Sequence, residues 1–114
     1  MTDSPLVDRV RLAMLTGGDA DLHRELTELF ALQGRRYLDE LAQMAADGDH
    51  DGVGRAAHRL RGAASNLGAA RLGVLAGTVE QLAATGADAC GLVGEARRVF
   101  EVTCAELMGD RAES

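Results

Sequence analysis

His58 is the residue of this sequence whose surroundings point most directly to chemistry. It lies in a predicted helix, with Gly54 one turn before it and Gly62 one turn after it on the same face. Each glycine inside a helix costs about 0.8–1 kcal/mol relative to alanine. An imidazole between two positions without side chains is open to a large partner. We therefore predict that a phosphoryl group, and the protein that carries it, must reach this ring.

The apolar residues of the same helix point away from His58. At about 100° per residue, His58 lies about 140° from the centre of the apolar stripe. That stripe consists of Val53, Ala57, Leu60, Ala64 and Leu67. Gly54, Arg61, Gly62 and Ser65 fall within about 60° of His58 on the same wheel. The pattern predicts an exposed imidazole surrounded by two glycines, a serine and an arginine.

The residue types around His58 favour phosphoryl transfer. A neutral imidazole nitrogen is a good nucleophile near pH 7, because its ordinary pKa is about 6.5. Phosphoryl transfer needs mainly positioning and stabilisation of charge. Arg61 lies three residues after His58 and is expected to reach the phosphoryl oxygens. Arg55 and Arg59 flank the same surface and are expected to assist or to meet an acidic partner.

Composition predicts one all-helical domain over residues 1–114. Apolar residues make up 46% of the chain and aromatic residues only 3%, so leucine, valine and alanine must form the core. The pattern predicts helices over about 5–15, 20–46, 51–67, 69–84 and 88–108. Because the connections are short, we expect an antiparallel up-down four-helix bundle, with the short first helix across one end or side.

Several local signals set the expected details of these helices. Ser4 and Pro5 are expected to be the cap and first residue of the first helix, and Gly68 the end of the third. The polar tail Gly109–Ser114 is expected to fray. The apolar face of the first helix is predicted to contain Leu6, Val10 and Ala13. The apolar stripe of the second is predicted to be Leu22, Leu26, Leu29, Gln33, Tyr37, Leu41 and Met44.

Hairpin geometry suggests a partner for the ring. If the chain reverses near Gly68, His58 lies ten residues before the turn and Glu80 twelve residues after it. The two residues should then lie at similar heights on adjacent antiparallel helices. The Glu80 carboxylate is expected to accept a hydrogen bond from Nδ1–H of His58, which would leave Nε2 as the nucleophile.

At this point the sequence resembles the histidine phosphotransfer (HPt) domain family. The resemblance rests on Gly48–Asp49, Ala57–Gly62, Ala64–Ala69, Leu75 and Glu80. The family's core pattern is a histidine, any residue, leucine, lysine and glycine, with a second glycine six residues later. Leu60, Gly62 and Gly68 match this pattern, and Arg61 stands where the family usually has lysine. That change keeps the positive charge but alters its shape.

The resemblance implies a four-helix bundle that relays a phosphoryl group between receiver-domain aspartates through His58. Arg61 would stabilise the phosphoryl charge, Gly62 would give access, and the receiver would hold Mg²⁺, so no cofactor or metal is expected on this chain. The implied partners are response-regulator receiver domains and a hybrid histidine kinase. The chain would be a monomeric carrier without kinase activity of its own. The expected partner-binding residues are Gly54, Arg55, Arg59 and Ser65.

Charge and hydropathy exclude other classes of function. The net charge is −6 and no long basic stripe occurs, which argues against nucleic-acid binding. No apolar run is long enough for a transmembrane helix, and no signal pattern begins the chain, so we expect a cytoplasmic protein. Cys90 and Cys104 lie in one predicted helix, roughly 21 Å apart, and are expected to be small buried thiols rather than a disulfide.

Three other interpretations remain beside the carrier. The chain could be an adaptor bundle that docks a receiver or another helix without being phosphorylated. It could be the dimerisation and phosphoacceptor part of a histidine kinase, although no nucleotide-binding segment and no glycine-rich phosphate loop occurs. Asp47–Gly52 copies the start of an EF-hand loop, but His58 stands where calcium needs a glutamate. His23 and His50 are expected to be ordinary surface histidines.

Overall fold

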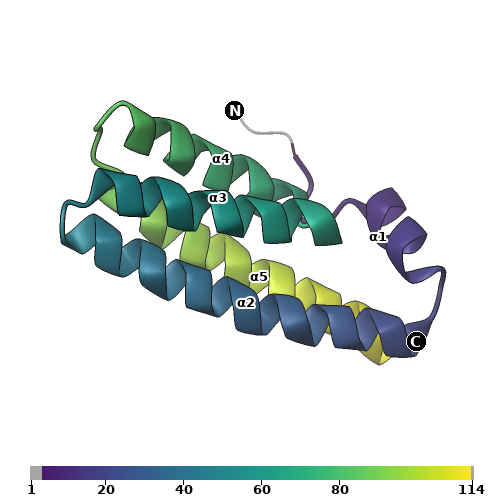
Figure 1. Ribbon diagram of the computed structural model, residues 1–114. Helices are drawn as coiled ribbons and strands as arrows, with labels where there is room; N and C mark the ends of the chain where they lie inside the picture. The colour runs from purple at the N-terminus through teal and green to yellow at the C-terminus, as the bar shows by residue number, and fades with distance from the viewer. Residues whose placement is uncertain (1–3, 114) are drawn as a thin grey trace.

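The computed structural model describes residues 4–113, and the side chains of residues 4–109. The described residues form five helices and no strand: α1 (Arg9–Thr16), α2 (Ala20–Ala46), α3 (His50–Leu67), α4 (Ala70–Ala84) and α5 (Cys90–Glu113). The helices α2 to α5 alternate in direction and form a bundle, and α1 lies across one end (Figure 1). The predicted all-helical bundle is therefore confirmed.

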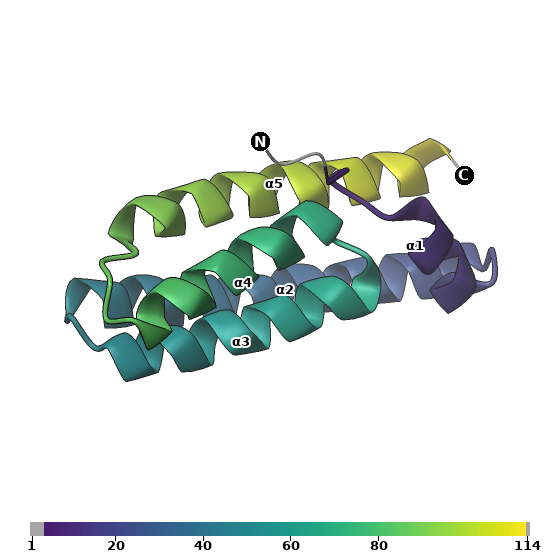
Figure 2. The same cartoon turned by 90° about the horizontal axis from the view of Figure 1, so that it is seen from above.

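Helices α3 and α5 occupy opposite corners of the bundle. Helix α3 packs against α2 and α4, and α5 packs against the same two helices. Seen from above, α4 lies between α3 and α5 (Figure 2). The outer wall of α3 therefore faces solvent. No described helix combines the length and apolar character needed to cross a membrane.

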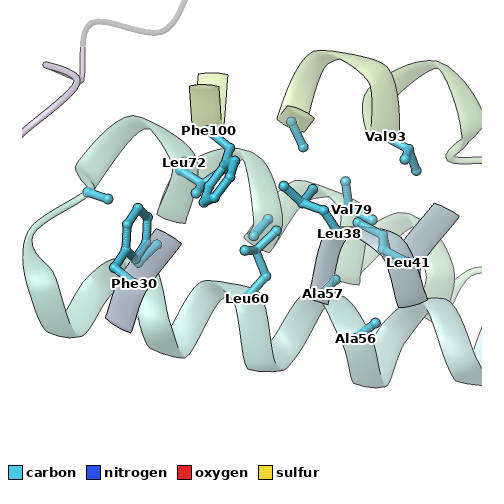
Figure 3. Packing of buried hydrophobic residues seen from close by; sticks show 14 of the residues in the cluster. Phe30, Leu38, Leu41, Ala56, Ala57, Leu60, Leu72, Val79, Val93 and Phe100 are labelled. Carbon is cyan, nitrogen blue, oxygen red and sulfur yellow. The ribbon is translucent and has the colours of Figure 1, made fainter. Parts of the chain in front are cut away.

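Leucines, valines and small residues fill the core, with one aromatic pair (Figure 3). The rings of Phe30 and Phe100 lie with their centroids 5.6 Å apart. Alanines allow the helix backbones to approach closely, and five of them are fully buried. These five are Ala56, Ala57, Ala64, Ala76 and Ala96. The large side chains that are also fully buried include Leu38, Leu41, Leu60, Leu72 and Val79.

Helix α1 begins later than the sequence predicts. It starts at Arg9, and Pro5 precedes it by four residues. The cap is Asp8 rather than Ser4, because the Asp8 carboxylate accepts a hydrogen bond from the backbone N–H of Arg11 at 3.0 Å. An acceptor at that position satisfies one of the free N–H groups of the first turn.

The same segment holds the turn between α3 and α4. The backbone N–H of Asp8 donates to the carbonyl oxygen of Gly68 at 2.7 Å. The Arg11 side chain donates from Nε and from a terminal nitrogen to Asn66, at 3.1 and 3.2 Å. Gly68 has a φ of +96° and ends α3 as predicted. A Cβ atom there would also lie 3.1 Å from the carbonyl oxygen of Asp8. Both the left-handed backbone conformation and this close carbonyl oxygen therefore favour glycine.

Two predicted apolar faces differ from those that the structure buries. Val10 of α1 is 71% exposed, and Leu29 of α2 is 49% exposed. The buried residues of α2 are Thr27, Phe30, Ala31, Gly34, Leu38 and Leu41. The predicted stripe of α2 is confirmed for Leu41, which is in the core, and for Leu26, Tyr37 and Met44, which pack against it, and is wrong for Leu29. The centre of the buried face was missed because two of its positions, Thr27 and Gly34, carry no large apolar side chain. The Thr27 hydroxyl is satisfied by donating to the carbonyl oxygen of His23 at 2.8 Å.

The last helix is longer than predicted, and one of its cysteines is exposed. Helix α5 runs to Glu113, beyond its predicted end at about residue 108. Cys104 is buried as expected, and burial raises the pKa of its thiol to about 11. Cys90 is exposed instead, because it is the first residue of α5. The Asp88 carboxylate accepts a hydrogen bond from the backbone N–H of Cys90 at 2.9 Å.

The contact between α2 and α5 predicts an unusual effect of a mild substitution. A Cβ atom at Gly34 would lie 2.3 Å from Cε1 of Phe100, which is itself buried. In a helix, alanine is more favourable than glycine by about 0.8–1 kcal/mol. We nevertheless expect Gly34→Ala to lower the free energy of unfolding by roughly 1–2 kcal/mol, because the Phe100 ring must shift in a packed core. Urea unfolding measures this change.

The control is Gly94→Ala on α5, where a Cβ atom would meet nothing within 4 Å. That variant should be unchanged or more stable by up to about 1 kcal/mol. If Gly34→Ala were as stable as Gly94→Ala, the close packing of α2 on Phe100 would be wrong.

Candidate functional site

His58 projects from the outer wall of α3, as the sequence predicts. Its side chain is 63% exposed, whereas its neighbours Ala57 and Leu60 are fully buried. A Cβ atom at Gly62 would meet nothing within 4 Å, so that glycine borders open space. A Cβ atom at Gly54 would lie 3.7 Å from Cβ of Ala83 on α4. Gly54 therefore faces the neighbouring helix, and Gly62 faces solvent.

The Glu80 carboxylate lies beside the ring. Its Oε2 atom is 3.0 Å from Nδ1 of His58, which is hydrogen-bond distance. The Glu80 side chain is 30% exposed, so it is less hydrated than the ring. The approach expected from the hairpin geometry is thus present, because Gly68 closes the turn at the predicted position. The role of Glu80 in chemistry stays a prediction.

Arg61 also contacts both groups. Its Nε atom lies 3.3 Å from Oε1 of Glu80, and a terminal nitrogen lies 3.2 Å from Nδ1 of His58. The side chain passes over Gly77 of α4, where a Cβ atom would be in ordinary van der Waals contact with Cδ of Arg61, at 3.5 Å. The guanidinium therefore lies on the Nδ1 side of the ring, whereas the sequence suggested only that it would point toward a phosphoryl group.

The two other arginines of the predicted site differ from each other. A terminal nitrogen of Arg59 forms an ion pair with Glu40 of α2, and the guanidinium lies 5.7 Å from the centre of the Tyr37 ring. Arg59 is thus held against α2. The Arg55 side chain makes no hydrogen bond or ion pair with any described residue. Of the arginines with described side chains, Arg36 on α2 shares this property.

A shallow hollow of about 480 Å³ extends from His58 along the contact between α3 and α4. Three of the predicted partner-binding residues, Gly54, Arg55 and Arg59, line it together with His58 and Glu80. The sequence did not indicate its remaining lining residues, which are His50, Asp51, Ala83 and Ala84. His50 could have been found from its spacing, because it lies eight residues before His58 and so on the same face.

Ser65 lies outside this hollow. It is exposed, and its Oγ atom would lie 3.3 Å from a Cβ atom at Gly73 of α4. Ser65 therefore lies where α3 and α4 pack farther along the hairpin. The described residues contain no group of three or more histidine, cysteine, aspartate or glutamate side chains that could hold a metal ion.

An exposed apolar patch lies on α2, the helix that also holds Arg59. Leu29 and Leu32 are 49% and 69% exposed, and with Gln33 and Arg36 they line a hollow of about 370 Å³. Leu29 and Gln33 also line a second hollow that reaches Ala63 and Asn66 of α3. This patch was not predicted, because the apolar periodicity of α2 places Leu29 inside the bundle. The four residues Leu29, Leu32, Gln33 and Arg36 are called the α2 patch below.

Comparison with known proteins identifies relatives of the chain. The Hpt domain family matches residues 25–109, which extend from α2 into α5. Among solved structures, the chain is similar to histidine-containing phosphotransfer protein B (HptB) from Pseudomonas aeruginosa PAO1, with a TM-score of 0.89 and 25% sequence identity. The similarity covers 98% of this chain and 99% of that chain. No curated protein matches the chain.

Proposed function

Because the chain belongs to the Hpt domain family, we propose that His58 is its phosphoacceptor and that the domain relays phosphoryl groups between receiver domains. The observation that carries this assignment is the hydrogen-bond distance of 3.0 Å between Nδ1 of His58 and the Glu80 carboxylate. A proton held on Nδ1 leaves a lone pair on Nε2, the nitrogen farther from Glu80. The exposed ring is then both oriented and nucleophilic.

The proposed step needs little from this chain beyond positioning. The Nε2 lone pair attacks the phosphorus of an aspartyl phosphate on the receiver. A nitrogen–phosphorus bond forms as the bond from phosphorus to the aspartate oxygen breaks, and the electron pair leaves with the carboxylate. The Nδ1–H bond to Glu80 offsets the positive charge that develops on the ring. The reverse step passes the phosphoryl group to another receiver.

Arg61 and Gly62 are proposed to assist this step from the same helix. The Arg61 side chain is 46% exposed, so its guanidinium has room to turn from Glu80 to the phosphoryl oxygens. Gly62 leaves the approach open, since a Cβ atom there would meet nothing within 4 Å. We expect Mg²⁺ to be held by the receiver and not by this chain. We also expect no kinase activity of the domain alone.

The proposed partners are response-regulator receiver domains and a hybrid histidine kinase, which a monomeric domain would meet in turn. We propose that a receiver docks across α3 and onto the α2 patch. The patch exposes Leu29 and Leu32, and Leu29 also lines a hollow that reaches Ala63 and Asn66 of α3, so the patch adjoins the α3 wall. A contiguous exposed apolar surface is typical of a binding site. Arg36 and Arg55 have no partner among the described residues and suit the acidic phosphoacceptor site of a receiver.

The phosphoacceptor assignment predicts that His58→Ala takes up no phosphoryl group. The protein would be incubated with a phosphorylated receiver domain, and acid-labile, base-stable phosphate would be followed on this chain. We expect full loss of label in His58→Ala, because no other histidine of the described residues lies at hydrogen-bond distance from a carboxylate. Equal labelling of wild type and His58→Ala would support the adaptor function instead.

The control for this experiment is His23→Gln. His23 lies on α2 with Nε2 3.0 Å from the carbonyl oxygen of Leu107, outside the site. This variant should be labelled like the wild type. A loss of label there would show that the assay reports general damage to the bundle.

Because Gly62 borders open space, we predict that Gly62→Leu blocks transfer without damaging the fold. Leucine favours helix over glycine by about 0.8 kcal/mol, so helicity and thermal stability should be kept or raised. The side chain would fill the open space beside His58, and we expect the transfer rate to fall at least tenfold, about 1.4 kcal/mol in barrier. The matched control is Gly94→Leu, at another open glycine on α5. Normal transfer by Gly62→Leu would contradict the proposed role of Gly62 in access.

The docking face predicts an effect on affinity that is separate from chemistry. Leu32→Glu places a negative charge in the α2 patch, next to a receiver site that is itself acidic. We expect the receiver concentration for half-maximal transfer to rise about tenfold, with little change in the rate at saturation. Val102→Glu, at a valine of α5 that is 50% exposed, is the control. If both variants behaved alike, the α2 patch would not be the docking face.

A further inference from the structure

The Nδ1 atom of His58 has two neighbours that make opposite demands on it. The Glu80 carboxylate lies 3.0 Å away and, when ionised, accepts hydrogen bonds only. A terminal nitrogen of Arg61 lies 3.2 Å away and donates hydrogen bonds only. In a neutral imidazole, Nδ1 carries either a proton or a lone pair. The neutral ring can therefore bond to one of these neighbours at a time.

The two bonds correspond to the two tautomers of the ring. When Nδ1 donates to Glu80, the proton is on Nδ1 and Nε2 has the lone pair. When Nδ1 accepts from Arg61, the proton is on Nε2, and Nε2 has no lone pair to attack phosphorus. The tautomers interconvert by exchanging protons with water, so no other reactant is needed.

We infer that Arg61 competes with Glu80 for Nδ1 and thereby restrains the nucleophilic tautomer of His58 while no receiver is bound. The competition is a property of the free domain, whereas its consequence for transfer rests on the proposed function. When the guanidinium turns to a phosphoryl group, Nδ1 is left to Glu80 alone. One movement of Arg61 then stabilises the phosphoryl charge and also returns the ring to its reactive form.

The contacts of Arg61 permit this movement. Its Nε atom lies 3.3 Å from Oε1 of Glu80, yet that buried oxygen accepts no hydrogen bond from a described residue. The pair is therefore held by charge rather than by a directed bond. The side chain is 46% exposed, and the adjacent Gly62 places no atom in its way. The guanidinium can leave without opening the core.

The shape of arginine is essential to the inference. A guanidinium carries separate donors, so Nε can lie near Glu80 while a terminal nitrogen reaches Nδ1. A lysine ammonium has a single nitrogen on a flexible stem and would pair with the Glu80 carboxylate. Arg61→Lys therefore keeps the charge beside Glu80 and removes the second donor. Arg61→Met removes both.

The test is the tautomer ratio of His58 in the free domain. The ¹⁵N chemical shifts of the ring nitrogens would be measured on protein labelled with ¹⁵N-histidine, at the alkaline end of a titration where the rings are neutral. We expect the ratio of Nδ1–H to Nε2–H forms to rise about threefold to tenfold in both Arg61→Lys and Arg61→Met, the effect of losing one competing hydrogen bond. Glu80→Leu should lower the ratio below that of the wild type, because Arg61 is then the only neighbour.

The controls lie in the same molecule. Arg55→Met removes an arginine of α3 that has no partner, and it should leave the His58 ratio unchanged. The rings of His23 and His50 report any general change of the fold. An unchanged ratio in Arg61→Met would overturn the inference, and a rise in Arg61→Met without a rise in Arg61→Lys would overturn the role of the second donor.

This measurement needs no receiver and no phosphoryl group. An unchanged tautomer ratio in Arg61→Met would not contradict the assignment of His58 as phosphoacceptor. Uptake of label by His58→Ala would contradict that assignment without changing the measured tautomer ratio. The two outcomes are therefore separable.

Discussion

The turn at Gly68 is the constraint on which the geometry of the site depends. Two antiparallel helices bring together residues at similar distances from the turn that joins them, so the position of the turn decides what lies beside His58. A shift of one residue in α4 would rotate Glu80 by about 100° around that helix and away from the ring. The turn is defined by the left-handed backbone of Gly68 and by the bond from the N–H of Asp8 to its carbonyl oxygen. Helix α1, which contributes no residue to the site, thus helps to set its register.

The bundle keeps the ring exposed and still limits its orientation. Ala57 and Leu60 are fully buried on either side of His58, which fixes the α3 backbone that bears the imidazole. Only the Glu80 side of the ring is close to partly buried protein, where a charge-assisted hydrogen bond is stronger than in water. The opposite side faces solvent. A histidine phosphotransfer domain needs this asymmetry, since the reacting nitrogen must be accessible and the other must be held.

The parts of this structure that depend on helix period and turn position were predictable from sequence. The meeting of His58 and Glu80 follows from the number of residues on each side of Gly68 alone. The inner face of α2 was not predictable in this way, because Gly34 takes part in the core by its lack of a side chain. The position of the Arg61 guanidinium could not be predicted from helix period and turn position either. A long exposed side chain chooses among several rotamers, and the choice depends on a carboxylate that belongs to another helix.

The arginines around His58 differ in how firmly they are held, and this difference bears on the relay. The chain has a net charge of −6, which would repel an acidic partner at long range, so positive charge near the ring must counter it locally. Arg59 is fixed by Glu40 and Tyr37 and gives a charge that does not move. Arg61 lies beside the Glu80 carboxylate and at hydrogen-bond distance from Nδ1 of His58, with a side chain that is 46% exposed and has room to turn. A carrier must bind a receiver, take up a phosphoryl group and release it again. A charge that is fixed and already paired adds little to the affinity for a receiver, whether or not the carrier holds a phosphoryl group. A mobile guanidinium can instead follow the phosphoryl group when it arrives and return to Glu80 when it leaves.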